Sequence, residues 1–186
     1  MLLKLISKQE KNNLLEVVEI LSISDKPLLW DGKKKDEITP KTDLGKISIE
    51  KGEKETALIA GLKAENGEHE NIFIFYENIE KRLLRKLKQF SLQKIDEPST
   101  RVEAAVTILK EILNEKKYTL PSVPKIMLFE LFLVALCDEN ISNIEWAILK
   151  EFQIHYQLED YIFNDLLERA EVMSREINKT ISVILE

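Results

Sequence analysis

An acidic segment in the second half of the chain has the residue types that bind hard cations. It carries side-chain oxygens at Asp138, Asn140, Ser142 and Glu145. Ca²⁺ prefers such ligands. Their spacing begins like that of an EF-hand loop, but the sixth position is Asn143, where an EF-hand loop has glycine, so the segment is not an EF-hand. One interpretation is therefore a divalent cation such as Ca²⁺ bound by Asp138, Asn140 and Glu145. No other cofactor is indicated.

The same residues have a purely structural interpretation. Ser142, followed three residues later by Glu145, is the pattern of a helix capping box. Asp138 suits a turn at the end of the preceding helix. Acidic side chains near a helix N-terminus also interact favourably with the helix dipole. Capping is the interpretation we favour, with the cation as the alternative.

Basic side chains lie beside an apolar helical stripe further upstream. They are Lys81, Arg82, Arg85, Lys86 and Lys88. A basic amphipathic helix can bind an acidic partner, with Arg82 and Arg85 as candidate contact residues. The alternative is a solvated face whose charges pair with the nearby Glu77 and Glu80.

Trp30 is a further candidate for partner binding. It follows Leu28 and Leu29 and precedes three consecutive lysines. A tryptophan surrounded by charge is typical of protein interfaces. The alternative, which we favour, is that Trp30 attaches an irregular segment to the core.

No familiar catalytic motif is present. His69 and His155 lie far apart without obvious ligand partners, and Cys137 has no base at a recognisable spacing. The chain lacks a glycine-rich phosphate loop, G-x-S-x-G and H-E-x-x-H. We therefore predict no enzymatic activity. A metal-dependent enzyme that uses the acidic residues is the remaining alternative.

The composition is that of a helical, acidic, globular protein. Of the 186 residues, 44% are hydrophobic, and the net charge of −6 disfavours general binding to phosphate backbones. Only 5 glycines and 5 prolines interrupt the chain, and the single cysteine excludes an internal disulfide.

The longest apolar run, 126–137, is too short to cross a membrane. We expect a cytoplasmic protein without a transmembrane segment.

Apolar periodicity and capping signals predict an all-α fold in one domain, 1–186. The predicted helices cover roughly 7–24, 79–90, 98–113, 124–137, 142–156 and 162–184. Ser7 and Glu10 form a predicted capping box for the first helix, and Ser122 is the predicted N-cap of the fourth. Residues 25–52 hold most of the breakers and are predicted as a long irregular segment. A small β element between 44 and 76 is an option, because Ile47 and Ile49 alternate with polar residues. For 53–65 the sequence leaves helix and strand open.

The segment 125–173 contains an apolar helix that ends in a pattern close to A-D-G-x-I-S-x-x-E. The matching residues are Leu136, Cys137, Asp138, Glu139, Asn140, Ile141, Ser142 and Glu145. In these residues the chain resembles the TerB-like (tellurite-resistance) helical family. It departs from the family where Glu139 replaces glycine and Cys137 replaces a small residue. The resemblance assigns 98–186 to a TerB-like half and 1–97 to a divergent half that is either a decayed repeat or unrelated.

The resemblance implies an all-helical fold, an association with stress responses, metal-related acidic sites and protein partners, and no firm enzymatic activity. The expected function is therefore that of a non-enzymatic, TerB-like, stress-response or tellurite-resistance-related protein that binds a protein partner. One alternative is a toxin-neutralising immunity protein, since an acidic surface masks basic sites on nucleases. A weaker one is a nucleic-acid or membrane contact through Lys81–Lys88. The sequence leaves the oligomeric state open.

Overall fold

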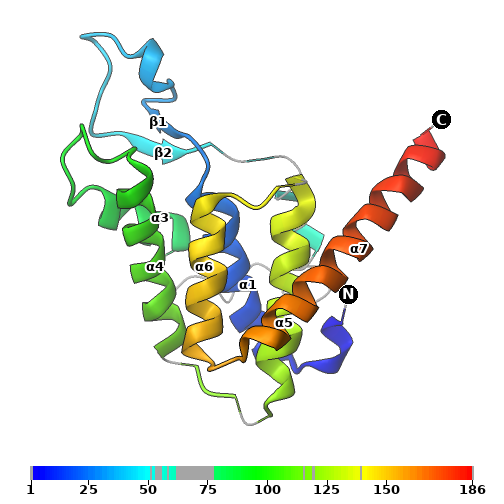
Figure 1. The fold of residues 1–186 in the computed structure, drawn as a ribbon. Coiled ribbons are helices and arrows are strands. Elements are labelled where there is room, and N and C mark those ends of the chain that lie inside the picture. The colour runs from blue at the N-terminus through cyan, green and yellow to red at the C-terminus, as the bar shows by residue number, and fades with distance from the viewer. Residues whose placement is uncertain are drawn as a thin grey trace.

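The structure is a computed structural model that describes residues 2–50, 52, 56–57, 59–61, 78–114, 116–118, 120–138 and 140–185. The described chain is mostly α-helical, which confirms the predicted fold class. Its helices form a bundle with a small two-stranded sheet at one end (Figure 1). The part of the predicted β element that covers 62–76 falls outside the described residues.

The elements follow one another in a simple order. The first half holds η1 (Leu3–Leu5), α1 (Lys8–Ser24), β1 (Leu28–Trp30), η2 (Lys35–Glu37), β2 (Ile47–Ile49) and α3 (Ile79–Leu87). The second half holds α4 (Pro98–Asn114), α5 (Ser122–Ala135), η4 (Leu136–Asp138), α6 (Asn143–His155) and α7 (Asp160–Leu185).

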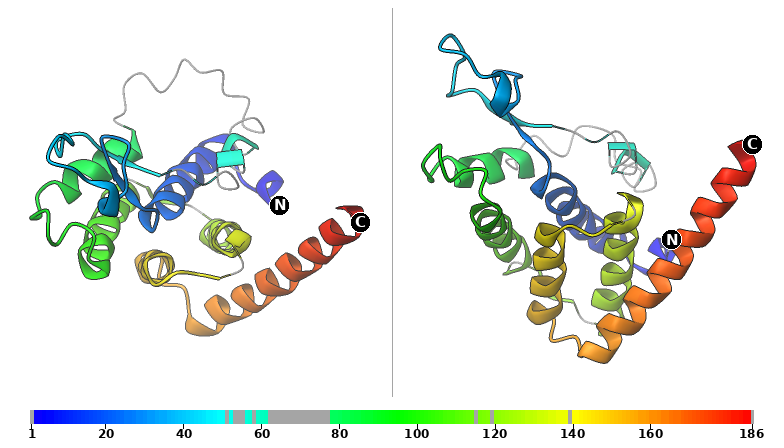
Figure 2. Two further views of the ribbon diagram at one scale, coloured as in Figure 1. Left: turned by 90° about the horizontal axis from the view of Figure 1, so that it is seen from above. Right: turned by 45° about the horizontal axis from the view of Figure 1, so that its top comes forward.

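Helix α1 is the centre of the bundle. It starts with the predicted capping box, in which Glu10 N–H donates to Ser7 Oγ at 3.3 Å and Ser7 N–H donates to Glu10 Oε2 at 2.6 Å. Helices α3, α4, α5 and α6 all pack against α1 (Figure 2). Its fully buried side chains include Leu14, Val17, Val18, Ile20 and Leu21.

The sheet lies in the segment that the sequence analysis predicted to be irregular. Strands β1 and β2 pair antiparallel, with Leu28 opposite Ile49 and Trp30 opposite Ile47. The predicted strand at Ile47 is confirmed, whereas its partner strand was missed. The turn after β1 is tight, because Trp30 and Lys33 exchange backbone hydrogen bonds of 2.8 and 3.0 Å. Its central residues are an Asp-Gly pair with φ of 52° and 77°, the conformation that a type I′ turn requires.

Helix α5 is the predicted buried helix, and it begins earlier than expected. Ser122 is its first helical residue and not its N-cap, a position that Pro121 occupies. Glu130 is buried in this apolar helix, and its Oε1 accepts a hydrogen bond from Leu2 N–H. Among the described residues, none of the helices combines the length and the apolar character needed to cross a membrane.

A structured connection fixes the direction in which α7 leaves the bundle. Gln157 has a φ of 51°, Leu158 N–H donates to Gln153 O at 3.0 Å, and Gln157 N–H donates to Ile154 O at 3.1 Å. This pair of bonds is a Schellman motif. The Gln153 side chain then donates from Nε2 to Leu158 O at 2.9 Å and to Asp160 Oδ1 at 2.8 Å. The first turn of α7 is therefore tied to α6.

Helix α7 is the longest helix, with 26 residues and a length of about 39 Å. It packs against α5, and its fully buried residues are Phe163 and Ala170. Both lie in its first half. The second half extends past the bundle to the C-terminal end (Figures 1 and 2).

Candidate functional site

The predicted acidic site lies where η4 ends and α6 begins. Ser142 caps α6, because Glu145 N–H donates to Ser142 Oγ at 3.3 Å. Glu145 completes the box by accepting from Ser142 N–H at 2.7 Å through Oε2. The capping interpretation of these two residues is confirmed.

A lysine ammonium group lies next to the other predicted cation ligand. Lys26 Nζ lies 3.2 Å from Asp138 Oδ2 and 3.8 Å from Asp25 Oδ1. Asn140 is exposed. Within the described parts of the chain, no group of three or more His, Cys, Asp or Glu side chains is arranged to hold a metal ion. A divalent cation at Asp138, Asn140 and Glu145 stays a prediction, and it would have to displace the Lys26 ammonium group.

Arg101 is the residue that sequence reasoning missed in this region. It lies on α4, is 5% exposed, and donates from Nη2 to Ser24 O at 2.5 Å and to Lys26 O at 2.7 Å. It therefore caps the C-terminal end of α1, where a cation is favoured by the helix dipole. Burial lowers the pKa of Arg101, and the nearby Asp96 and Asp25 oppose that shift. We call Asp25, Lys26, Arg101, Asp138 and Glu145 the polar junction.

Glu145 is the most strongly perturbed carboxyl group of the polar junction. Burial raises the pKa of Glu145 from 4.5 to about 7, and the charge of Asp25 adds to the shift. The hydrogen bonds with Ser142 and the charge of Lys26 oppose it. The folded protein therefore holds a proton on Glu145 more tightly than the unfolded chain does.

This shift predicts a pH-dependent contribution to stability. A carboxyl group whose pKa is raised in the folded state adds to the free energy of unfolding. This contribution is at its full size below pH 4.5 and is lost as the pH rises through about 7. Glu145→Gln retains a capping-box side chain but does not ionise. The free energy of unfolding of Glu145→Gln minus that of the parent should therefore rise by roughly 1 kcal/mol as the pH increases from 4.5 to about 7. This value allows for solvent screening. Urea unfolding at several pH values measures this difference, with Glu10→Gln in the exposed capping box as control. A pH-independent difference would contradict the prediction.

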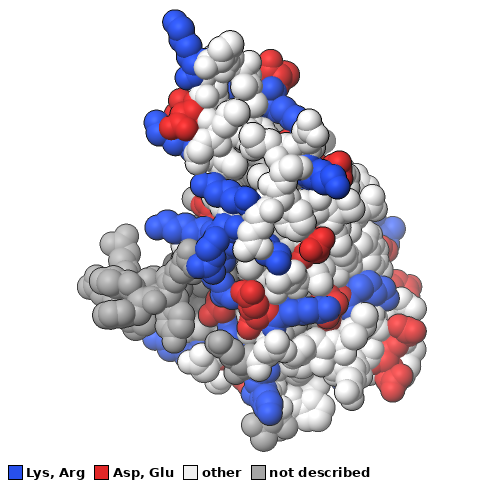
Figure 3. All heavy atoms as spheres, turned by 90° about the vertical axis from the view of Figure 1, so that its left-hand side faces the viewer, with Lys and Arg blue, Asp and Glu red and all other residues white. Residues whose placement is uncertain are grey.

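The basic cluster on α3 forms part of a mixed-charge face. Figure 3 shows lysines and arginines on this side of the molecule with acidic side chains among them. Arg82 Nη2 lies 2.9 Å from Glu111 Oε2 of α4, and Lys88 Nζ donates to Gly45 O at 3.1 Å. Arg82 is thus paired with a carboxylate of α4. Pairing of the basic residues with Glu77 and Glu80 stays a prediction, and Glu77 lies outside the described residues. A partner contact through Arg82 and Arg85 stays a prediction.

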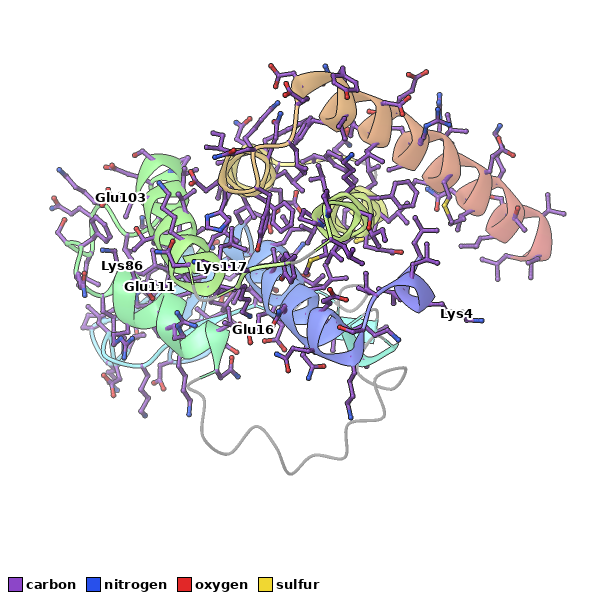
Figure 4. The ribbon with its side chains drawn as sticks, turned by 90° about the horizontal axis from the view of Figure 1, so that it is seen from below. Lys4, Glu16, Lys86, Glu103, Glu111 and Lys117 are labelled. Carbon is purple, nitrogen blue, oxygen red and sulfur yellow. The ribbon has the colours of Figure 1, made fainter. Side chains whose placement is uncertain are left out.

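Acidic and basic residues also alternate on the underside of the bundle. Figure 4 shows Glu16 of α1, Lys86 of α3 and Glu111 of α4 on neighbouring helices. Lys116 Nζ lies 2.5 Å from Glu16 Oε2 and joins the chain after α4 to α1. This contact attaches the segment after α4 to α1.

Trp30 does not provide a surface anchor. Its side chain is 2% exposed and belongs to the hydrophobic core. The prediction of Trp30 as a partner-contact residue is wrong in this structure, because strand β1 turns the indole inward. The favoured alternative, in which Trp30 attaches this segment to the core, is confirmed.

Of the histidines and the cysteine, the structure describes His155 and Cys137, and His155 lies far from the polar junction. His155 ends α6 and packs edge-on against Tyr156, with ring centroids 4.7 Å apart. It lies roughly 15 Å along the helix from Glu145 at the other end. Cys137 is half-buried, and His69 lies outside the described residues. The structure does not bring His155 to the polar junction.

An exposed apolar feature lies on α7. A groove of about 520 Å³ runs between α7, α5 and the N-terminal segment, and it is lined by Leu2, Phe129, Leu166, Val172 and Met173. Acidic residues Asp165 and Glu168 line it too, together with Arg169, which pairs with Asp165 at 3.0 Å. We call this feature the α7 groove.

An exposed apolar stripe continues from the α7 groove to the end of the helix. Ile177 is 45% exposed, Ile181 47% and Ile184 74%. Their spacing of four and three residues places them on one side of the helix. We call the half of α7 that carries this stripe the α7 tail.

Comparisons with protein-family models, with curated proteins and with solved structures give no match to this chain.

Proposed function

We propose that this protein is a non-enzymatic, TerB-like protein that acts by binding a protein partner, and that the partner docks in the α7 groove. The observation that carries this proposal is the exposure of apolar side chains along α7, beginning with Val172 at 47%. Soluble proteins rarely expose contiguous apolar surface without a binding role. The TerB-like motif supports the family part of the proposal, since its described residues form η4, which directly follows α5, and the capped start of α6.

The chemistry of the groove favours an amphipathic helix with basic residues as the ligand. Leu2, Phe129 and Val172 supply apolar contact area, and Asp165 and Glu168 supply negative charge on the same groove. A helix in a groove presents apolar anchors at helical spacing, and complementary charge at its edges adds specificity. This recognition requires no metal ion.

A model peptide tests the proposal directly. The probe is an amphipathic helix of about 18 residues, built from leucine and lysine, labelled for fluorescence anisotropy and added to dilute protein. We expect Val172→Asp to weaken binding at least about tenfold, because a charge then enters the apolar floor. We also expect a matched leucine–glutamate peptide to bind more weakly than the lysine peptide.

Tyr161→Asp is the matched control for this experiment. Tyr161 lies on the same helix and is 72% exposed, but it does not line the groove. Equal loss of binding in Val172→Asp and Tyr161→Asp would contradict docking in the groove. Equal affinity for the lysine and glutamate peptides would contradict the role of Asp165 and Glu168.

A toxin-neutralising role is the second candidate function, and the acidic side of the α7 groove is the observation that favours it. An acidic surface that flanks apolar anchors suits a partner with a basic functional surface. In that case the natural complex is tight, has fixed stoichiometry and is unaffected by chelators. A complex that dissociates on adding a chelator would instead favour the cation at Asp138, Asn140 and Glu145.

A further inference from the structure

A buried carboxyl group of α5 contacts the N-terminal segment. Glu130 is 2% exposed and lies among apolar residues of the helix, and its Oε1 accepts a hydrogen bond from Leu2 N–H. Replacing a buried charged group with a well-packed apolar side chain is often neutral or stabilising, so core packing alone does not account for a carboxyl group here. One use of such a group is to fix the conformation of the chain that it contacts. The contact with Leu2 N–H indicates that Glu130 fixes the segment 2–6.

Residues 2–6, which we call the N-terminal strap, form one tight turn with two buried side chains. Leu3 and Ile6 are buried. Leu2 and Leu5 are exposed. The turn is closed by a hydrogen bond from Leu5 N–H to Leu2 O at 2.9 Å. A second bond runs from Ile6 N–H to Leu3 O at 3.4 Å. The strap therefore rests on much less buried apolar surface than the helices of the bundle.

Helix α1 does not need the strap for its own start. Its capping box pairs Ser7 with Glu10 and satisfies two backbone amides from within residues 7–10. The backbone is extended at Ile6, with φ of −120° and ψ of 152°, and at Ser7, with φ of −69° and ψ of 165°. These two extended residues separate the strap from the helix. The strap can therefore leave the bundle while α1 stays folded.

The strap also forms part of the wall of the α7 groove. Leu2 lines the groove together with Phe129 of α5 and Val172 of α7. Glu130 itself does not line it. A ligand that contacts Leu2 favours the attached state of the strap, and by thermodynamic reciprocity the attached strap favours the ligand.

We propose that Glu130 is a positioning residue for the α7 groove: it holds the N-terminal strap on α5, the strap opens separately from the bundle, and strap attachment and ligand binding stabilise each other. This inference rests on the proposed function of the groove and adds a residue that acts on the ligand only through Leu2. The strap is then the part of the groove that opens first, since α5 and α7 are held by the buried core.

Hydrogen exchange on the full chain tests the first half of this inference. The amides of Leu5 and Ile6 donate within the strap and report its opening, whereas the amide of Leu21 in α1 reports opening of the bundle. We expect Glu130→Leu to speed exchange at Leu5 and Ile6 by about tenfold or more and to leave exchange at Leu21 unchanged. The melting temperature should not fall, because an apolar side chain replaces a buried carboxyl group.

Two control variants separate loss of the anchor from loss of charge and from general disturbance of the strap. Glu130→Gln removes the charge but keeps an oxygen acceptor for Leu2 N–H, so strap exchange should stay within about threefold of the parent. Lys4→Gln changes an exposed side chain of the strap that points away from the bundle, and it should have no effect (Figure 4). Equal acceleration in Glu130→Gln and Glu130→Leu would overturn the hydrogen-bonded anchor.

The leucine–lysine peptide tests the second half. In the parent, saturating peptide should slow exchange at Leu5 and Ile6 by about fivefold or more, because the bound peptide contacts Leu2. Glu130→Leu should bind the peptide about fivefold more weakly in the anisotropy titration, although residue 130 does not line the groove. Glu130→Gln and Lys4→Gln should bind it as the parent does, which excludes a direct effect of the Glu130 charge on the basic peptide.

The remaining outcomes separate this inference from the proposed function. Equal strap exchange in the parent and Glu130→Leu would overturn the inference. A lower melting temperature of Glu130→Leu with faster exchange in every helix would also overturn it, because Glu130 would then support the core as a whole. A faster strap with unchanged peptide affinity would overturn the coupling and leave the proposed function standing. A parent that binds no peptide would overturn the proposed function and the coupling, while strap exchange would still show whether Glu130 holds a separable strap.

Discussion

Replacing Arg101 with methionine is expected to lower the free energy of unfolding by about 3 kcal/mol. The substitution keeps an unbranched apolar stem of similar reach but removes the guanidinium donors to Ser24 O and Lys26 O. It leaves these carbonyl groups without their donor and removes one of the two cations near the half-buried Asp25, which then keeps only Lys26 at 3.8 Å. This is more costly than the loss of an exposed charge. For a chain of this length the melting temperature should fall by roughly 6–12 °C, as measured by thermal and urea unfolding.

Two further variants show whether Arg101 acts in this way. Arg101→Lys retains the charge but not the planar fork, so its effect should lie between the parent and Arg101→Met. Asp25→Asn should reduce the cost of Arg101→Met, because the carboxylate whose charge Arg101 partly balances is then gone. Additive effects of Asp25→Asn and Arg101→Met would contradict a direct electrostatic link between the two residues.

Phe163→Ala is expected to lower the free energy of unfolding by about 3–4 kcal/mol and to release α7 from the bundle. Phe163 is 1% exposed and lies edge-on to Phe132, with ring centroids 5.0 Å apart. Its ring centroid is 6.0 Å from that of Trp146. Lys150 Nζ lies 3.7 Å from the centre of its ring and adds a cation–π contact. The buried attachment of α7 to α5 and α6 thus depends strongly on one side chain.

Hydrogen exchange distinguishes release of α7 from general destabilisation. In Phe163→Ala, the amides of α7 should lose protection while those of α1 and α4 retain most of theirs. Tyr161→Ala, two residues away and exposed, should change neither the stability nor the exchange pattern measurably. A uniform loss of protection in all helices would show that α7 unfolds only together with the bundle.

The helices and their starts were predictable because the signals for them are local. Ser7 with Glu10 and Ser142 with Glu145 each specify a helix N-terminus within four residues, and both capping boxes are present as predicted. The Asp31–Gly32 pair was an equally local signal for a tight turn, and it was overlooked among the other breakers of that segment. Recognising it would have identified the end of strand β1.

The polar junction was only partly predictable, because its members come from distant parts of the chain. Asp138 and Glu145 were selected for their spacing in sequence. Lys26 and Asp138 lie 112 positions apart, and Arg101 reaches carbonyl groups 75 and 77 positions away. Nothing in the local pattern around Arg101 distinguishes it from a surface arginine, since its role depends on where α1 ends relative to α4.

The exposure of the candidate docking surface on α7 could not be predicted from the local sequence either. The apolar periodicity from Ile162 to Ile184 correctly predicted one long helix. It did not indicate which turns are covered. Phe163 and Ala170 are buried, whereas Ile181 and Ile184 on the same periodic stripe are exposed. Burial depends on the length of α5 beneath, which the sequence of α7 does not contain.

The central position of α1 has a consequence for synthesis on the ribosome. This helix is translated before α4, α5 and α6, yet these later helices cover its fully buried residues, among them Val17 and Leu21. At translation speeds of 5–20 residues per second, on the order of ten seconds separate the end of α1 from the end of α6. During this interval the nascent chain presents an uncovered apolar helix. We therefore expect ribosome-bound fragments that end before α6 to recruit chaperones and to be degraded readily, whereas fragments that include α6 become protected from protease.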